Sequence, residues 1–226
     1  MNILTFDTSF DKTYVTLGRD EKILKNVLVN STEHEYHSVF LIPEIIKVLK
    51  AENLTMQDIS AFGINAGPGS FTGIRICNTV ARVAAQQLDA MLVPVSSLHI
   101  ISRLAGNGKN VLVLTNARKN KAYAGIYNGF DEIKAPFAVN LDDIDELLSN
   151  FDGEILTDSF MKAFLDEKSV ESRNFEGKND EFGKFLYEIT VEKLKNGTKD
   201  DFHWAKAKPQ YVQPPSITIS KKAVVK

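Results

Sequence analysis

The sequence has little cysteine, little histidine and no excess of either charge, and each shortage excludes a class of protein. A single Cys among 226 residues cannot form an internal disulfide or a cysteine-based zinc cluster. The 27 Lys and Arg against 29 Asp and Glu give a net charge of −2, so nothing attracts the whole chain to nucleic acid or anionic membranes. There is no run of 18 apolar residues, and the start MNILTFDTS lacks the basic residues of a signal peptide. We therefore expect a soluble, reduced, cytoplasmic protein that is not bound to a membrane.

The charges are nevertheless distributed unevenly. Residues 131–154 contain eight acidic side chains and one Lys, whereas residues 193–226 contain eight Lys and two Asp. A solvated acidic face and a basic tail account for this pattern. The alternative is that the basic stretch contacts a polyanion or an acidic partner.

The pattern of apolar residues predicts an α/β protein with two lobes. With 43% apolar and 25% charged residues the composition is that of a globular chain. Expected strands cover residues 2–7, 13–19, 22–29, 61–65, 91–95, 111–114, 122–127 and 154–157. Expected helices cover residues 38–52, 74–88, 96–104, 141–149, 159–165 and 182–194, with Pro43 either kinking the first or marking its first turn. The break Gly106-Asn107-Gly108 divides residues 1–105 from a smaller lobe, residues 106–208, and 209–226 form an extended tail.

The loop from Gly67 to Gly73 is the most informative local feature. Its glycines permit positive φ, and Ser70 and Thr72 can cap the following helix, so Gly67, Gly69, Ser70, Thr72 and Gly73 are candidates for holding an anion such as phosphate. The loop is neither a Walker loop nor the dinucleotide fingerprint, because no Lys-Ser/Thr follows it and its glycines are spaced differently. A purely structural strand-to-helix turn is the alternative.

Asp7-Thr8-Ser9 ends the first strand, and Asp7 and Thr8 are further candidates for a phosphate or hydrated Mg²⁺ site. An ordinary Asx turn explains them equally well. Arg75, one turn into the next helix, can pair with an anion or with a carboxylate across an interface.

A metal site or a catalytic thiol is not expected. His34 and His37 are three residues apart, whereas a zincin needs His at i and i+4, and His99 and His203 are isolated. Cys77 lies in an apolar helix without a convincing His partner.

Together these segments resemble the TsaB (YeaZ) family, the bacterial accessory proteins of tRNA threonylcarbamoyladenosine formation. The resemblance runs, in order and spacing, through ILTFDTS, TYVTLG, INAGPGSFTGIRI, VPVSSL, NARKNKAYAGIY and KPQYV, and GPGSFTGIR is its most specific part. It implies an actin-like ATPase-domain (ASKHA, ribonuclease H-like) fold of two lobes with mixed sheets flanked by helices. It also implies a heterodimer with the catalytic paralogue TsaD, joined by the ATPase TsaE, that modifies the adenosine beside the anticodon.

The resemblance also implies that this chain is a required subunit without its own catalytic site. In TsaD-type relatives two metal-binding His follow a Val-ending strand, and the matching positions here are Ser97 and Ile101. We therefore expect no metal and no cofactor in this chain, with ATP or ADP and a metal in the partner subunits. tRNA would be reached through the complex.

A partner surface is expected on the helices near 38–52 and 71–89. The first is apolar over much of its circumference, and the second has small residues that permit close helix packing. The candidate interface residues are Leu41, Ile45, Leu49, Arg75, Asn78, Ala81, Arg82 and Ala85. Packing on the chain's own sheet is the alternative, and the same surface could form a homodimer.

Three other functions stay open at this point. A small ATPase or sugar-type kinase would use Asp7 and the glycine loop, a metalloprotease would need the missing ligand pair, and a binding module would use the Lys-rich tail.

Overall fold

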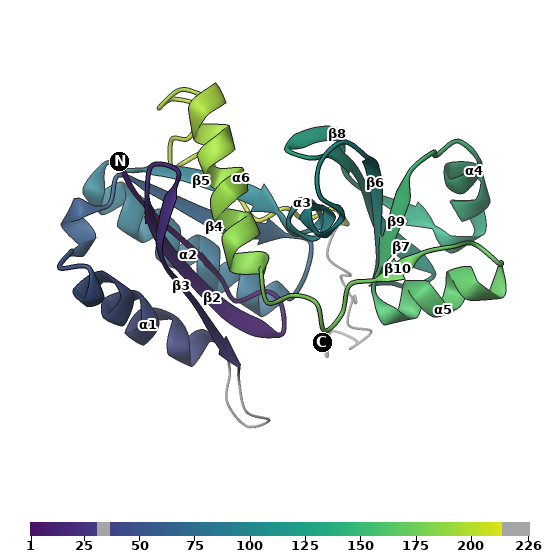
Figure 1. Ribbon diagram of the computed structural model, residues 1–226, viewed down its shortest axis with the longest axis horizontal. Helices are drawn as coiled ribbons and strands as arrows, with labels where there is room; N and C mark the ends of the chain where they lie inside the picture. The colour runs from purple at the N-terminus through teal and green to yellow at the C-terminus, as the bar shows by residue number, and fades with distance from the viewer. Residues whose placement is uncertain (31–36, 214–226) are drawn as a thin grey trace, which may run out of the picture.

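Two lobes, each built on a mixed five-stranded sheet, make up the molecule (Figure 1). The computed structural model describes residues 1–30 and 37–213, without the side chains of His37 and Ser38. The predicted His34-Glu35-Tyr36-His37 segment and the tail beyond Gln213 therefore lie outside the described part, apart from the backbone of His37.

The first sheet has the order β3-β2-β1-β4-β5. Its strands are β1 (Asn2–Asp7), β2 (Lys12–Arg19), β3 (Lys22–Asn30), β4 (Ala61–Gly67) and β5 (Met91–Ser96). The first three form the predicted antiparallel meander, in which Asn2 pairs with Arg19 and Asp7 with Tyr14. Strands β4 and β5 continue the sheet in parallel, so the carboxyl ends of β1 and β4 lie at the same edge.

Helices cover both faces of this sheet. Leu4 and Phe6 alternate with Ile3 and Thr5 along β1, and the first pair faces α1 (His37–Ala51) and α2 (Phe71–Leu88). The opposite face packs on α6 (Phe182–Asn196), which approaches so closely that a Cβ on Gly63 would lie 2.1 Å from Thr190 Oγ1. In Figure 1, α6 crosses the first sheet on the side opposite α1.

The second sheet repeats the topology of the first. Its order is β10-β9-β6-β7-β8, with β6–β7 and β7–β8 antiparallel and β6–β9 and β9–β10 parallel. The strands are β6 (Asn110–Arg118), β7 (Lys121–Asn128), β8 (Asp131–Asn140), β9 (Glu154–Thr157) and β10 (Arg173–Asn174), and helices α4 (Ile144–Ser149) and α5 (Ser159–Glu167) cover one face. This duplication confirms the predicted α/β fold of two lobes with mixed sheets, which is the actin-like architecture.

A short helix, α3 (Ser97–Ser102), joins the two lobes. It packs against β6 and β7 of the second sheet and also against α6, β4 and β5. Val95, Leu98, Tyr127 and Phe182 belong to one apolar cluster that draws residues from both lobes. The lobes are therefore held together by a common core as well as by a linker.

Two sequence-based expectations need correction, and one open alternative is resolved. Helix α6 lies beyond the Gly106–Gly108 boundary in sequence, yet it packs on the first sheet, because its apolar face fits the side of that sheet left open by α1 and α2. Strand β8 was not expected, since it contains Pro136 and several charged residues; it is an edge strand, where proline is tolerated. Pro43 lies inside α1 rather than in its first turn.

Candidate functional site

The two predicted anion-binding segments meet at the carboxyl edge of the first sheet. The Asp7–Ser9 turn follows β1, and the glycine loop, residues 67–73, connects β4 to α2. The Ser70 N–H donates to the Ser9 carbonyl at 3.3 Å, and the Thr8 hydroxyl donates to the Gly73 carbonyl at 3.0 Å. The structure thus brings together all seven predicted residues, Asp7, Thr8, Gly67, Gly69, Ser70, Thr72 and Gly73.

Asp7 is occupied by internal hydrogen bonds. The Ser9 N–H and the Ser9 hydroxyl both donate to its Oδ1 at 2.7 Å, and Asn65 Nδ2 donates to its Oδ2 at 2.9 Å. Its side chain is buried, and this burial raises the pKa of the carboxyl group despite those donors. In this arrangement Asp7 fixes the turn after β1, because both of its oxygens already have partners.

The glycine loop packs directly on that turn. A Cβ on Gly73 would lie 2.1 Å from the Thr8 carbonyl oxygen, so the close approach of α2 requires glycine there. Ser70 caps α2 by accepting a hydrogen bond of 3.3 Å from the Gly73 N–H, which starts the helix at Phe71 instead of the predicted 74. Gly69, Ser70 and Thr72 remain exposed. Anion binding at these residues stays a prediction. The loop itself forms the connection between β4 and α2.

The positions that match the TsaD metal ligands have structural roles. The Ser97 hydroxyl donates to the Pro68 carbonyl, and Ile101 is buried in the core shared by the lobes. The His99 ring stacks on Tyr127 with 4.7 Å between ring centres, and burial lowers its pKa to about 4. Within residues 1–30 and 37–213 no three His, Cys, Asp or Glu side chains converge as a metal site would need.

The predicted interface residues are mostly buried in the chain's own core. Leu41, Ile45 and Leu49 line the side of α1 that faces the sheet, and Ala81 and Ala85 do the same on α2, so the expectation that these five side chains face a partner is wrong for the single chain. Asn78 is also buried, whereas Arg75 is exposed and Arg82 is half-buried.

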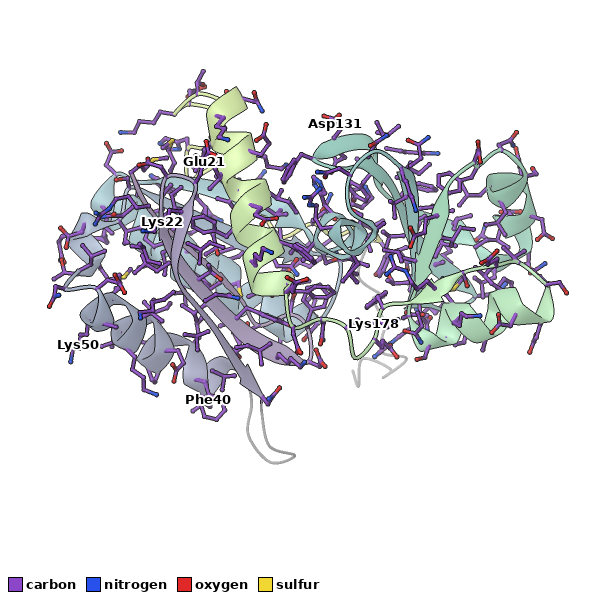
Figure 2. All side chains as sticks on the ribbon, viewed as in Figure 1. Glu21, Lys22, Phe40, Lys50, Asp131 and Lys178 are labelled. Atoms are coloured by element: carbon purple, nitrogen blue, oxygen red, sulfur yellow. The ribbon has the colours of Figure 1, made fainter. Side chains whose placement is uncertain are left out.

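The surface of α1 carries a different apolar stripe. Val39, Ile42 and Ile46 have 62%, 46% and 45% of their surface exposed, and their spacing of three and four residues places them on one side of the helix. Val83 on the neighbouring helix α2 is 56% exposed. Figure 2 shows α1 on the outside of the first lobe, with Lys50 pointing away from the sheet at its end. We call Val39, Ile42, Ile46 and Val83 the apolar stripe.

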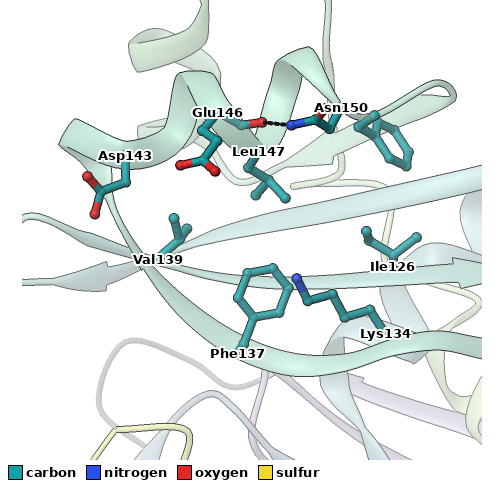
Figure 3. A pocket seen from close by; sticks show the side chains of 9 residues that line it. Ile126, Lys134, Phe137, Val139, Asp143, Glu146, Leu147 and Asn150 are labelled. Atoms are coloured by element: carbon teal, nitrogen blue, oxygen red, sulfur yellow. Dashed lines mark hydrogen bonds between the residues drawn. The ribbon is translucent and has the colours of Figure 1, made fainter.

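The second lobe contains a hollow that the sequence did not indicate. Helix α4 occupies the place that α1 has in the first lobe, yet it has 6 residues against 15. A hollow of about 400 Å³ results between α4 and strands β7 and β8. Figure 3 shows Phe137 and Val139 facing Leu147 across it, with the carboxylates of Asp143 and Glu146 at its rim.

Comparison with known proteins identifies the family. The family model TsaD, tRNA N6-adenosine threonylcarbamoyltransferase, matches residues 22–176, more than half of the chain. The tRNA threonylcarbamoyladenosine biosynthesis protein TsaB of Bacillus subtilis is 31% identical over 164 residues, which cover 69% of this chain and 69% of that protein. The chain belongs to the TsaB (YeaZ) family. The family is related to TsaD, as the matching model shows.

Other TsaB proteins match over shorter stretches. The Escherichia coli protein is 28% identical over 130 residues, which are 56% of this chain and 55% of that protein. The crystal structure titled YeaZ from Pseudomonas aeruginosa superposes with a TM-score of 0.71 at 18% identity, covering 93% of this chain and 99% of that one. This TsaB family member thus has the YeaZ fold over nearly its whole length. None of its helices within the described residues could span a membrane.

Proposed function

We propose that this protein is a non-catalytic subunit for tRNA threonylcarbamoyladenosine biosynthesis, and that it binds and activates a TsaD-type transferase. Family membership supports a role in this pathway, since the curated relatives are named as biosynthesis proteins of this nucleoside. The relation to TsaD supports a paralogous partner, because two chains of one fold can present matching helical faces.

The observation that carries the proposal is the apolar stripe. Four large aliphatic side chains, each 45% to 62% exposed, lie on two adjacent helices of one lobe. Burying them against the helices of another protein removes apolar surface from water and stabilises a complex. The sides of α1 and α2 that pack on the first sheet are separate from these four residues, so docking leaves the fold intact.

The wider assembly is part of the proposal. A TsaE-type ATPase joins the heterodimer, tRNA is contacted through the complex, and the work takes place in the cytoplasm. This chain supplies no cofactor of its own, and ATP or ADP and a metal belong to the partner subunits. A homodimer can use the same stripe when the catalytic partner is missing.

An ATPase or kinase using Asp7 has less support. The Asp7 carboxylate is only 1% exposed, and three hydrogen-bond donors inside the chain occupy it. A nucleotide phosphate or its Mg²⁺ would have to displace those donors.

Reconstitution tests the proposal directly. Threonylcarbamoylation of tRNA is measured with purified TsaD-type and TsaE-type proteins, with and without this chain. We expect modification to depend on its addition. Modification at the full rate in its absence would refute the activating role.

The docking surface is tested with a matched pair of variants. Ile46→Asp places a charge in the apolar stripe, whereas Ile133→Asp makes the same change at a residue of the second lobe that is 60% exposed. Both positions face solvent, so both variants should fold. Co-elution with the TsaD-type protein should be lost only for Ile46→Asp; retention by both, or loss by both, shows that the stripe is not the docking surface.

A further inference from the structure

A groove of about 470 Å³ runs along the outer side of α2, beside the stripe residue Val83. One wall is the helix, and the other is the segment from Trp204 to Tyr211, which follows α6 in the chain and packs against the first lobe. That segment is fixed in place, because the Gln210 N–H donates to the Ala66 carbonyl at 2.7 Å and Ala207 is buried in the core. We call it the α2 groove.

The α2 groove is lined by cations without anionic partners. Arg75 and Arg82 both line it, and no carboxylate of the described residues forms an ion pair with either guanidinium. Helix α2 contains no Asp or Glu, and neither does the stretch 202–213. That stretch adds the exposed Lys208, whereas Lys206 is paired with Asp200 at 2.7 Å. In a chain of net charge −2 this is a local excess of positive charge.

Arg75 is held in a defined orientation. Its guanidinium carbon lies 3.7 Å above the centre of the Phe71 ring, and its Nε donates to the Tyr211 hydroxyl at 2.9 Å. A guanidinium fixed in this way loses little conformational entropy when it binds a carboxylate.

Asn78 adds a side-chain oxygen that accepts no hydrogen bond from the described residues. Its side chain is 3% exposed and lines the groove, and its Nδ2 donates to the Ile74 carbonyl at 2.9 Å. Its Oδ1 is buried and has no hydrogen-bond partner among the described residues. A buried carbonyl oxygen without a donor is costly, so a ligand that brings an N–H group gains binding free energy there.

We propose that the α2 groove binds an acidic segment of the protein partner, whose carboxylates pair with Arg75 and Arg82 and whose side-chain N–H group reaches Asn78 Oδ1. The two arginines are seven residues apart on one side of α2, about 10 Å along the axis. A partner helix with two acidic residues seven positions apart matches that separation. This inference rests on the proposed docking of a TsaD-type partner, and it names the chemistry that the docking recognises.

The same charges disfavour pairing of two copies of this chain. A symmetric dimer through α2 would bring the arginines of both copies into one interface, since two-fold interfaces use the same surface on both sides. The α2 groove therefore favours an acidic partner over a second copy of this chain. The two associations should respond to salt with opposite sign, because salt screens attraction in one and repulsion in the other.

The experiment measures the dissociation constant for the purified TsaD-type protein at about 50 mM and about 500 mM salt. The unmodified chain should bind more weakly at high salt, whereas its self-association, followed by sedimentation, should become stronger. The double variant Arg75→Gln, Arg82→Gln should bind the partner about 10-fold or more weakly at low salt and lose most of the salt dependence. The matched control Lys178→Gln removes an exposed cation of the segment between β10 and α6 and should change neither quantity (Figure 2).

Asn78→Leu tests the role of the unpaired Asn78 Oδ1. It should leave the free chain at least as stable and weaken the complex, because the partner's N–H group loses its acceptor. If the double arginine variant binds as tightly as the unmodified chain with the same salt dependence, the α2 groove is not the recognition site. If Ile46→Asp also binds normally, the docking surface itself is wrong; if only Ile46→Asp fails to bind, docking stands and the acidic segment is refuted.

Discussion

Arg75 Nε donates a hydrogen bond of 2.9 Å to the Tyr211 hydroxyl, and this bond connects the start of α2 to the C-terminal segment. Phe71 lies beside the same pair, with 5.8 Å between its ring centre and that of Tyr211. The contact therefore supports the wall of the α2 groove. Breaking this hydrogen bond should let the C-terminal segment open locally, and that opening can be measured.

Tyr211→Phe should loosen the C-terminal segment with little effect on global stability. The variant loses one exposed hydrogen bond to a charged group, which is worth about 1 kcal/mol, so local opening becomes about fivefold more frequent. Hydrogen exchange of the Gln210 amide, which donates to the Ala66 carbonyl, reports this opening. Tyr123→Phe in β7 is the control, since the Tyr123 hydroxyl makes no hydrogen bond with the described residues. Equal exchange of the Gln210 amide in both variants would show that the Arg75 contact does not hold the segment.

Gly73→Ala should destabilise the fold by about 2–4 kcal/mol, because the added Cβ meets the backbone of the Asp7–Ser9 turn. Its nearest atom would be the Thr8 carbonyl oxygen at 2.1 Å, and backbone cannot swing aside as a long side chain does. Gly69→Ala in the same loop is the control, since its Cβ would have only an ordinary contact of 3.5 Å. Urea denaturation measures both variants. A similar loss of stability in both variants would show that the loop requires glycine generally, and that the contact with Thr8 is not the specific cause.

The sequence predicted the strands and helices better than their arrangement. The helix over residues 38–52 has apolar residues on more than one side, so its pattern could not say whether Leu41 or Ile42 faces the core. Packing on the first sheet decides this: Leu41, Ile45 and Leu49 are buried against the sheet, and Ile42 stays exposed. The buried side of a mostly apolar helix is set by tertiary packing.

The candidate site shows the same limit. The sequence indicated that each of the two loops follows a strand, but that they meet depends on the parallel pairing of β1 with β4, which the structure shows. The sequence could not show that the Asp7 carboxylate is filled by Ser9 and Asn65, or that Arg75 is oriented by a residue 136 positions away. The repeated topology of the two sheets was also hidden, since it involves strand order without recurring identical residues.

The buried His99 should make the fold less stable as pH falls below neutrality. Its pKa is lowered from 6.5 to about 4, so between these values the unfolded chain binds a proton that the folded chain does not. The stability contributed by the neutral ring is present above pH 6.5 and is lost progressively towards pH 4, about 3 kcal/mol in total. Urea denaturation at several pH values measures the slope.

His99→Phe should remove that part of the pH dependence while keeping the stack on Tyr127. Phe175→Leu is the control, because it disturbs the same apolar cluster without removing a titrating group and should keep the slope. An unchanged slope in His99→Phe would assign the acid sensitivity to other groups.

Cys77 should react with thiol reagents only when the junction beneath α2 opens. Burial raises the pKa of its thiol, so both access and ionisation limit the reaction. The Thr8 N–H donates to Cys77 Sγ at 3.2 Å, and the Thr8 hydroxyl lies at the same distance from Sγ while it bonds the Gly73 carbonyl. Thr8→Val removes the hydroxyl and should accelerate labelling about 10-fold, whereas Thr79→Val on the exposed side of α2 should not. As Cys77 is the only cysteine, labelling followed by mass spectrometry reports this site alone. Rapid labelling of the unmodified native chain would mean that the turn after β1 and the glycine loop separate readily, and the tight Gly73–Thr8 packing would not describe the junction in solution.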